Sequence, residues 1–290
     1  MAVSQSESPV PGHADRLEPL VRRVLADNPS PYTLHGTQTY LVGDGETLAV
    51  IDPGPADPAH IDAIVAAAGD AKITAICCTH THRDHSPAAR PLQAKTGAQI
   101  VGCAALALPS GGPRSDAPFD ADYAPDRELG DGDTVTGDGW TLRAVATPGH
   151  TSNHLCYALE ESGALFTGDH IMGWSTTVVV PPDGDMADYM ASMQKVHDRE
   201  DRVFYPAHGP QVDKTRQLVR GMIGHRRQRE RQILKQLDTG PKSIPQLVEV
   251  MYVGLDDRLI PAAGQSVNAH LIDLSNRGKV TNDGATWTTT

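Results

Sequence analysis

Seven side chains that could bind metal ions gather at four points of the sequence. Four of them fall within six residues, in the segment Thr79-His80-Thr81-His82-Arg83-Asp84-His85. The other three are His150, Asp169 and His208, which stand alone as candidates later in the chain. Imidazole and carboxylate ligands together favour zinc, with iron or manganese as alternatives. The residue types and their spacing therefore predict a metal site.

Each candidate follows a short stretch that is typical of a β-strand. These stretches are Ile73–Cys78, Thr141–Ala146, Ala164–Thr167 and Val203–Tyr205. Short apolar runs bounded by turn residues are typical of buried strands. Functional side chains often lie on loops at the ends of such rigid elements. We therefore expect the candidates to converge at one edge of a sheet.

The rest of the first 212 residues predicts further strands and helices. Residues 1–30 indicate a tail or an edge element, and Pro109–Asp126 a long surface loop. The predicted strands are Thr37–Val42, Thr47–Ile51, Ala98–Cys103, Thr134–Thr136 and His154–Leu159; the predicted helices are Asp57–Ala68, Pro87–Thr96 and Asp185–Val196. Mixed sheets covered by helices make an α/β layered sandwich.

The composition changes at Asp213. Residues 213–235 hold eight Lys or Arg and two acidic residues, a net charge of 8 − 2 = +6, and predict a basic helix. Helices over Ser243–Met251 and Ser266–Arg277, then a hairpin at Asn282-Asp283-Gly284, favour a small winged-helix module. A plain helical cap is the alternative. The predicted domains are 1–212, a basic connecting helix 213–239, and a winged-helix-like domain 240–290.

The order His-x-His-x-Asp-His, His, Gly-Asp, His resembles the metallo-beta-lactamase superfamily between Thr37 and Gly209. The turn Asp52-Pro53-Gly54 is also similar to that family's pattern. The resemblance implies an αββα sandwich with two metal ions. It assigns His80, His82 and His150 to one ion, Asp84, His85 and His208 to the second, and Asp169 to both.

The resemblance also implies roles in catalysis. Seven protein ligands suit two ions about 3.5–4 Å apart that share a carboxylate. A hydroxide between the ions would be the nucleophile, with Asp84 and Asp169 as catalytic residues. We expect Asp52, His154 and His170 to support the ligands. The general acid stays open between His154, Tyr205 and a metal-bound water. Five other histidines are expected on the surface or in packing: His13, His35, His60, His197 and His225.

Segments outside the metal-binding motif resemble one particular group within this superfamily. Asn28-Pro29-Ser30-Pro31, the run 36–42 with Gln38, and the run 181–186 are similar to the beta-lactamase-like-2 group, which includes an endoribonuclease. Single-stranded RNA is therefore the first substrate hypothesis, with Arg226, Arg227 and Arg229 as cations that would bind it. A thioester, lactone or beta-lactam is the alternative. A nucleic-acid-binding or scaffold role is ranked last, because it leaves the seven ligands unexplained.

Composition sets the remaining expectations. The net charge of −11 and the 4% aromatic content argue against a chain wholly covered by nucleic acid or lying on an anionic membrane. The four cysteines lack metal-binding spacing and are expected to be buried and unpaired. Neither a signal peptide nor a spanning segment is visible. We expect a cytoplasmic protein without a membrane partner, in which the C-terminal helices could form a homodimer.

Overall fold

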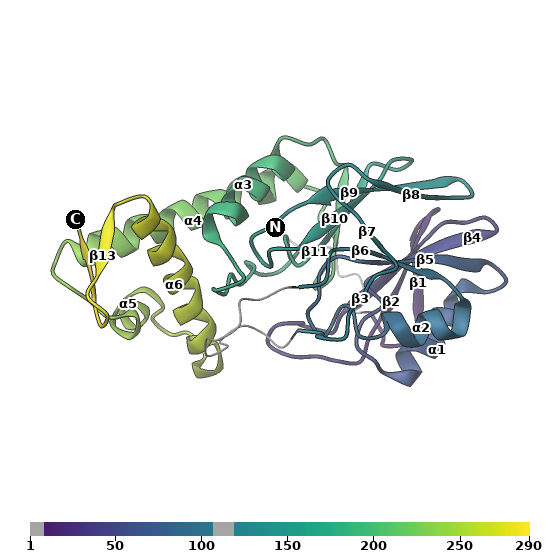
Figure 1. Cartoon of the computed structure of the whole chain (residues 1–290), viewed down its shortest axis with the longest axis horizontal. Helices are drawn as coiled ribbons and strands as arrows, with labels where there is room; N and C mark the ends of the chain where they lie inside the picture. The colour runs from purple at the N-terminus through teal and green to yellow at the C-terminus, as the bar shows by residue number, and fades with distance from the viewer. Residues whose placement is uncertain (1–8, 107–118) are drawn as a thin grey trace.

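The computed structural model describes residues 9–106 and 119–290. Two β-sheets lie face to face, and helices cover their outer faces (Figure 1). The strands of the first sheet are β1 (Ala14–Glu18), β2 (Val21–Leu25), β3 (Gln38–Val42), β4 (Thr47–Ile51), β5 (Lys72–Cys78), β6 (Gln99–Gly102) and β7 (Arg127–Glu128), in that order across the sheet.

The second sheet has five strands. In spatial order they are β12 (Val203–Pro206), β11 (Ala164–Gly168), β10 (Leu155–Leu159), β9 (Trp140–Ala146) and β8 (Thr134–Gly137). Residues of β10 alternate between two cores. Leu155, Tyr157 and Leu159 pack between the sheets, whereas Cys156 and Ala158 pack under the outer helices. Successive side chains of a strand point to opposite faces, and both faces of β10 are covered, so the whole strand is buried.

Helices α1 (Pro58–Ala68) and α2 (Ala89–Thr96) cover the first sheet. The Asp57 side chain caps α1, as predicted, and Gly97 ends α2 in the left-handed conformation. Helices α3 (Met186–His197) and α4 (Thr215–Leu237) cover the second sheet. The predicted αββα sandwich is confirmed. Within the predicted tail or edge element 1–30, residues 14–25 form the edge hairpin β1–β2, and residues 1–8 lie outside the described part of the chain. Residues 109–118 of the predicted surface loop lie outside it as well.

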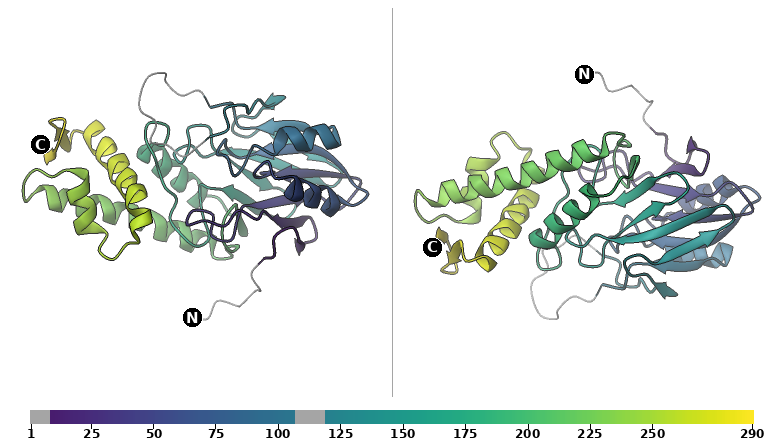
Figure 2. Two further views of the ribbon diagram at one scale, coloured as in Figure 1. Left: turned by 90° about the horizontal axis from the view of Figure 1, so that it is seen from below. Right: turned by 90° about the horizontal axis from the view of Figure 1, so that it is seen from above.

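The C-terminal unit has its own small core. It consists of α5 (Ile244–Met251), the short 3-10 helix Asp257–Leu259, α6 (Ile260–Asn276), β13 (Val280–Asn282) and β14 (Trp287–Thr289). Leu247, Leu271 and Trp287 pack there against Ile233 and Leu237 from the end of α4. Helix α4 thus runs from the sandwich to this unit (Figure 2).

The winged-helix prediction is confirmed, with one correction. Helix α6 begins at Ile260, six residues before the predicted start at Ser266. Pro261 and Gly264 look like helix breakers in the sequence, but proline fits the first turn of a helix because its missing N–H has no partner there. The four cysteines are buried and free, as expected. In the described ranges, the helices lack the combined length and apolarity that a membrane-spanning segment needs.

Candidate metal centre

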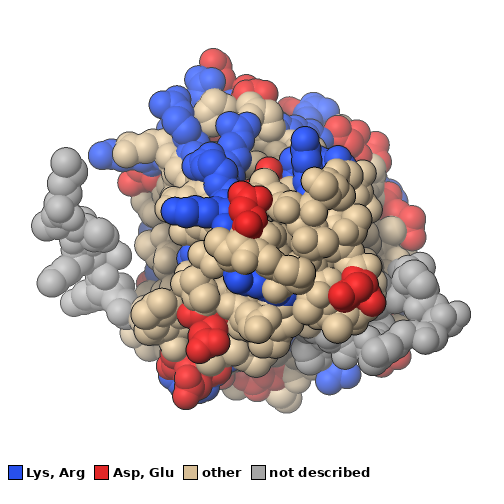
Figure 3. Space-filling view, turned by 90° about the vertical axis from the view of Figure 1, so that its left-hand side faces the viewer, with Lys and Arg blue, Asp and Glu red and all other residues tan. Residues whose placement is uncertain are grey.

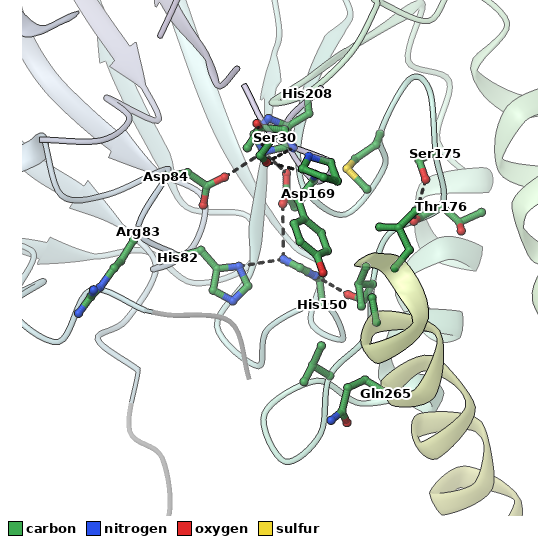
Figure 4. A pocket seen from close by; sticks show the side chains of 18 of the residues that line it. Ser30, His82, Arg83, Asp84, His150, Asp169, Ser175, Thr176, His208 and Gln265 are labelled. Carbon is green, nitrogen blue, oxygen red and sulfur yellow. Dashed lines mark hydrogen bonds and ion pairs between the residues drawn. The ribbon is translucent and has the colours of Figure 1, made fainter. Parts of the chain in front are cut away.

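The structure brings all seven predicted ligands to one edge of the sandwich. His80, His82, Asp84 and His85 lie on the loop after β5, and His150 lies on the loop after β9. Asp169 directly follows β11, and His208 lies two residues after β12. Figure 4 shows side chains from these separate loops pointing toward one another. Convergence of strand ends is therefore what assembles the cluster.

The ligand atoms fall into two groups. In the first, His82 Nδ1 lies 3.0 Å from His80 Nε2 and 3.1 Å from His150 Nε2. In the second, Asp84 Oδ2 lies 3.2 Å from His208 Nε2 and 3.5 Å from His85 Nε2. Each group therefore presents three ligand atoms to a common centre.

Asp169 lies between the two groups. Its Oδ2 is 3.6 Å from His150 Nε2, and its Oδ1 is 3.3 Å from His208 Nε2 and 3.6 Å from His85 Nε2. The two oxygens of one carboxylate thus face different groups. This is the arrangement that a carboxylate shared by two ions requires.

The spacing and the unmet polar atoms fit metal ions. Ligands about 2.0–2.1 Å from a tetrahedral ion are about 3.3 Å from one another. Three buried atoms, His85 Nε2, Asp169 Oδ1 and His208 Nε2, have no hydrogen-bond partner among the described residues. Such atoms are costly to bury unless something else satisfies them. Burial and the neighbouring His150 lower the pKa of His82 to about 3, which keeps this imidazole neutral.

Asp52, which the sequence predicts to orient a ligand, forms hydrogen bonds to residues of the histidine motif. Its carboxylate accepts hydrogen bonds from His85 Nδ1 at 2.9 Å, from the Thr79 hydroxyl at 2.8 Å and from the Thr79 amide at 2.7 Å. The Thr79 hydroxyl in turn accepts from His80 Nδ1 at 2.9 Å. One buried carboxylate therefore orients an imidazole in each group. Asp52 has φ of +47°, a left-handed conformation that is rare outside glycine.

Backbone carbonyls hold two further imidazoles. His150 Nδ1 donates to the Val178 oxygen at 2.7 Å, and His208 Nδ1 donates to the Gly36 oxygen at 3.2 Å. Each bond leaves Nε2 free to face the cluster, as is common for metal-ligating histidines. The sequence analysis missed Thr79, Val178 and Gly36. Only the role of Thr79 could have been predicted from the sequence, because it directly precedes the histidine motif and its hydroxyl can form a hydrogen bond with the neighbouring His80.

His154 contacts a predicted ligand, whereas neither ring nitrogen of His170 has a hydrogen-bond partner among the described residues. His154 Nε2 accepts the Asp169 amide N–H at 3.2 Å, while its Nδ1 donates to the Thr147 hydroxyl at 2.9 Å. His170 is buried beside the Tyr189 ring. Tyr205 packs between Tyr40 and Phe166 in the core. Neither His154 nor Tyr205 is among the described residues that line the cavity, and the predicted ligands His80 and His85 are not among them either.

The remaining histidines stay outside the cluster, as predicted. His13 and His35 are exposed, and His197 and His225 are partly exposed. His60 is buried, and its Nε2 lies 2.9 Å from the Thr39 hydroxyl. Burial lowers the pKa of His60 to about 4, so this imidazole packs in its neutral form.

A cavity of about 700 Å³ opens at the cluster. His82, Asp84, His150, Asp169 and His208 lie at one end of it. The opposite wall comes from the C-terminal unit, at the start of α6. The apolar lining side chains include Leu106, Phe119, Met172, Trp174, Val178, Val180, Leu259, Pro261 and Ala262. The cavity can therefore hold an apolar group next to the predicted metal ions.

The basic helix differs from its prediction. Arg226 is 3% exposed, stacks over the Tyr189 ring and donates to Ser266 Oγ at 3.2 Å. Arg229 stacks over the Tyr252 ring at 4.3 Å. Two of the three arginines predicted to bind RNA are therefore engaged inside the protein, and only Arg227 is exposed. No residue of α4 lines the described cavity, so the basic arm does not face the site.

Comparison with known proteins places this geometry in context. The model of the metallo-beta-lactamase superfamily matches residues 32–208, and that of the beta-lactamase associated winged helix domain matches 243–287. The beta-lactamase-like protein 2 homolog of Drosophila melanogaster is 34% identical over 281 residues, which cover 91% of each chain. An atrochrysone carboxyl ACP thioesterase of Aspergillus fumigatus is 34% identical over 76% of this chain and 65% of its own.

The solved structures agree on the fold. A metallo-beta-lactamase family protein from Thermus thermophilus superposes with a TM-score of 0.76 at 22% identity, over 95% of this chain and 100% of that one. At that identity the likeness concerns the fold alone. It nevertheless extends over the sandwich and the C-terminal unit together.

Proposed function

This chain belongs to the metallo-beta-lactamase superfamily and is a hydrolase, and we propose that it cleaves acyl thioesters with the help of two divalent metal ions. The observation that carries this proposal is the apolar cavity beside the ligand cluster. The thioesterase name of a relative that is 34% identical supports the same substrate class.

We assign the metal ligands as the sequence predicted them. His80, His82 and His150 would hold one ion, Asp84, His85 and His208 would hold a second, and Asp169 would contribute to both. Two bound ions, most simply zinc, would supply a nucleophilic hydroxide at neutral pH and polarise the carbonyl group. The protein's own part is to orient the imidazoles through Asp52, Thr79 and Val178.

The cavity wall favours an acyl group over a phosphodiester backbone. Trp174, Val178 and Leu259 can cover an apolar chain, and burial of such a chain from water stabilises the complex. Arg83 is the only Lys or Arg among the described residues that line the cavity, whereas Asp84, Asp169 and Asp183 also line it. Bound divalent ions would neutralise Asp84 and Asp169, so the scarcity of Lys and Arg is what disfavours a strand of RNA, which brings several phosphates.

The leaving group also favours a thioester. In hydrolysis, water oxygen bonds to the carbonyl carbon, the carbon–sulfur bond breaks, and the products are a carboxylic acid and a thiol. A thiol has a pKa of about 8.5, so a thiolate can leave with little help from a proton donor. A thioester therefore depends little on a general acid.

Single-stranded RNA is the second candidate. Exposed cations on α4, among them Arg220, Arg227 and Arg231, favour a polyanionic ligand. They lie outside the cavity, however, so they would bind a strand without directing it to the ligand cluster. We therefore rank RNA below a thioester. Lactones and beta-lactams are the remaining candidate substrates, because the same nucleophile would attack their carbonyl groups.

A hydrolysis panel tests the proposal. Zinc-loaded protein is incubated with S-octanoyl-N-acetylcysteamine, an octanoyl lactone, a beta-lactam and a single-stranded RNA. We expect the octanoyl thioester to be the preferred substrate and His82→Ala to abolish its turnover. His13→Ala, which changes an exposed histidine outside the cluster, serves as control. Efficient RNA cleavage without thioester turnover would contradict the proposal.

A further inference from the structure

Four cations form a stripe along one face of α4. Arg220, Arg227, Arg231 and Lys235 recur at intervals of seven, four and four residues. With 3.6 residues per turn, this spacing places them on the same side of the helix. All four are exposed. We call these residues the basic stripe. Figure 3 shows Lys and Arg side chains gathered on the upper part of this end of the molecule, where α4 lies in Figure 1.

The stripe is not neutralised by the protein itself. None of its four side chains forms an ion pair within the described ranges 9–106 and 119–290. Other cations nearby are paired or stacked: Arg277 bonds to Glu230 at 2.7 Å, and Arg229 lies over Tyr252. Like charges four residues apart destabilise a helix slightly. In a chain with a net charge of −11, an uncompensated stripe of this kind indicates an acidic partner.

The position of the stripe separates it from the reaction. No α4 residue lines the described cavity, so an anion bound to the stripe is not the group that is hydrolysed. The exposed large hydrophobic side chains of the described residues lie elsewhere, for example Tyr32 and Trp174. The stripe thus lacks the aromatic platforms on which single-stranded nucleic acids stack their bases. An acidic protein surface fits it better than a nucleic acid strand.

The inner face of α4 is linked to the cavity wall by a hydrogen bond. Arg226 donates to the carbonyl oxygen of Thr177, whose neighbours Thr176 and Val178 line the cavity. One side chain therefore spans the distance from α4 to the cavity wall. A partner that docks on the outer face of α4 therefore needs a flexible arm that carries its acyl group to the cavity.

We propose that the basic stripe docks an acidic acyl carrier domain, which delivers the thioester that the metal centre hydrolyses. This inference rests on the proposed thioesterase function. It assigns to α4 the recognition of the carrier and leaves the acyl group to the cavity. Electrostatic complementarity of this kind acts mainly on the rate of encounter, so it should be sensitive to salt.

The test compares two substrates that share one acyl group. Octanoyl thioesters of N-acetylcysteamine and of an acidic acyl carrier protein are hydrolysed by the zinc-loaded full chain. The stripe variant is Arg227→Glu/Arg231→Glu. The matched control is Lys72→Glu/Lys279→Glu, which changes the net charge equally at two exposed lysines outside α4. Thermal unfolding shows that each variant is folded.

We expect the stripe variant to lower kcat/KM about 10- to 100-fold for the carrier thioester, at low salt, and to leave the small thioester unchanged. The control variant should stay within about twofold of the parent on both substrates. Equal losses in the two variants, or no loss in the stripe variant, would overturn the docking inference while the small thioester still reports the proposed function. If the parent hydrolyses neither thioester, the proposed function itself fails, and the docking inference with it. RNA binding that the stripe variant loses, at an unchanged carrier rate, would instead assign the stripe to nucleic acid.

Discussion

Arg226, on helix α4, donates a hydrogen bond to the backbone carbonyl oxygen of Thr177, in the segment that follows Asp169. The Thr177 hydroxyl donates to the Asp169 carbonyl at 2.6 Å, and the next residue, Val178, accepts from His150 at 2.7 Å. A buried charge on the C-terminal side of the molecule thus fixes the backbone beside two predicted metal ligands.

Replacing Arg226 should therefore weaken metal binding. In Arg226→Met the 177–178 backbone loses its donor, and we expect metal affinity to fall about 10-fold or more, as for other groups that orient ligands. Competition with a chelator measures the affinity. Arg227→Met removes an exposed charge from the same helix and should leave the affinity unchanged. A folded Arg226→Met protein with the parent's metal affinity would refute this role.

Asp52→Asn should weaken the centre without disturbing the backbone. Asparagine tolerates the left-handed conformation that Asp52 adopts, so the turn is retained. The carboxylate charge beside His85 is lost, however, and we expect metal affinity to fall about 10- to 100-fold. Asp57→Asn, at the N-cap of α1, provides the matched control, since asparagine is an equally good cap. Equal affinities for Asp52→Asn and the parent would show that Asp52 does not orient the ligands.

Trp174→Ala should shift chain-length preference. Trp174 lines the cavity and is 39% exposed, so its ring is available to an acyl chain. Loss of this apolar contact should raise KM about 10-fold for an octanoyl thioester, which corresponds to about 1.4 kcal/mol of binding, and should change the acetyl thioester little. Steady-state kinetics on both thioesters give the comparison. An identical change for both chain lengths would mean that the acyl chain lies elsewhere.

His270 should make the fold sensitive to acid. Burial, with a further contribution from Arg226, lowers the pKa of His270 to about 3. The unfolded chain has a histidine pKa of about 6.5, so it binds the proton more readily than the native state does. The free energy of unfolding is therefore not reduced by His270 above about pH 6.5. It declines as the pH falls toward 3, by up to about 1.4 kcal/mol per pH unit.

The variant His270→Met tests this sensitivity by urea unfolding at pH 7 and pH 5. Between these values the parent should lose about 2 kcal/mol more than the variant, because only the parent has to keep the His270 imidazole neutral. His35→Met, at an exposed histidine, should lose as much as the parent. Parallel losses in the parent and in His270→Met would contradict the assignment.

The sequence predicted those parts of the molecule that local chemistry determines. The strand β4 (Thr47–Ile51), the Asp57 cap and the Gly97 helix end follow from β-rich composition, capping residues and turn residues. The convergence of His80, His150 and His208 could be predicted because all of them follow strands. The carbonyls of Gly36 and Val178 could not be predicted, since every residue carries one and only the fold selects those two.

The basic helix is a second case in which the sequence alone does not predict the roles of individual residues. Composition predicts that residues 213–235 form a charged helix, but it does not tell which arginines face the core. Arg226 and Arg227 are neighbours in the sequence, yet one is buried over Tyr189 and the other is exposed. Their different roles depend on how α4 packs against α3 and α6, which is a property of the assembled fold.

The metal content of the protein tests the central claim most directly. After the apo protein is loaded with zinc and excess metal is removed, elemental analysis counts the ions per chain. We predict two ions in the parent and one in His82→Ala, where the first group loses a ligand and the second keeps Asp84, His85 and His208. One ion or none in the parent, or two in His82→Ala, would contradict a centre in which Asp169 joins two metal ions.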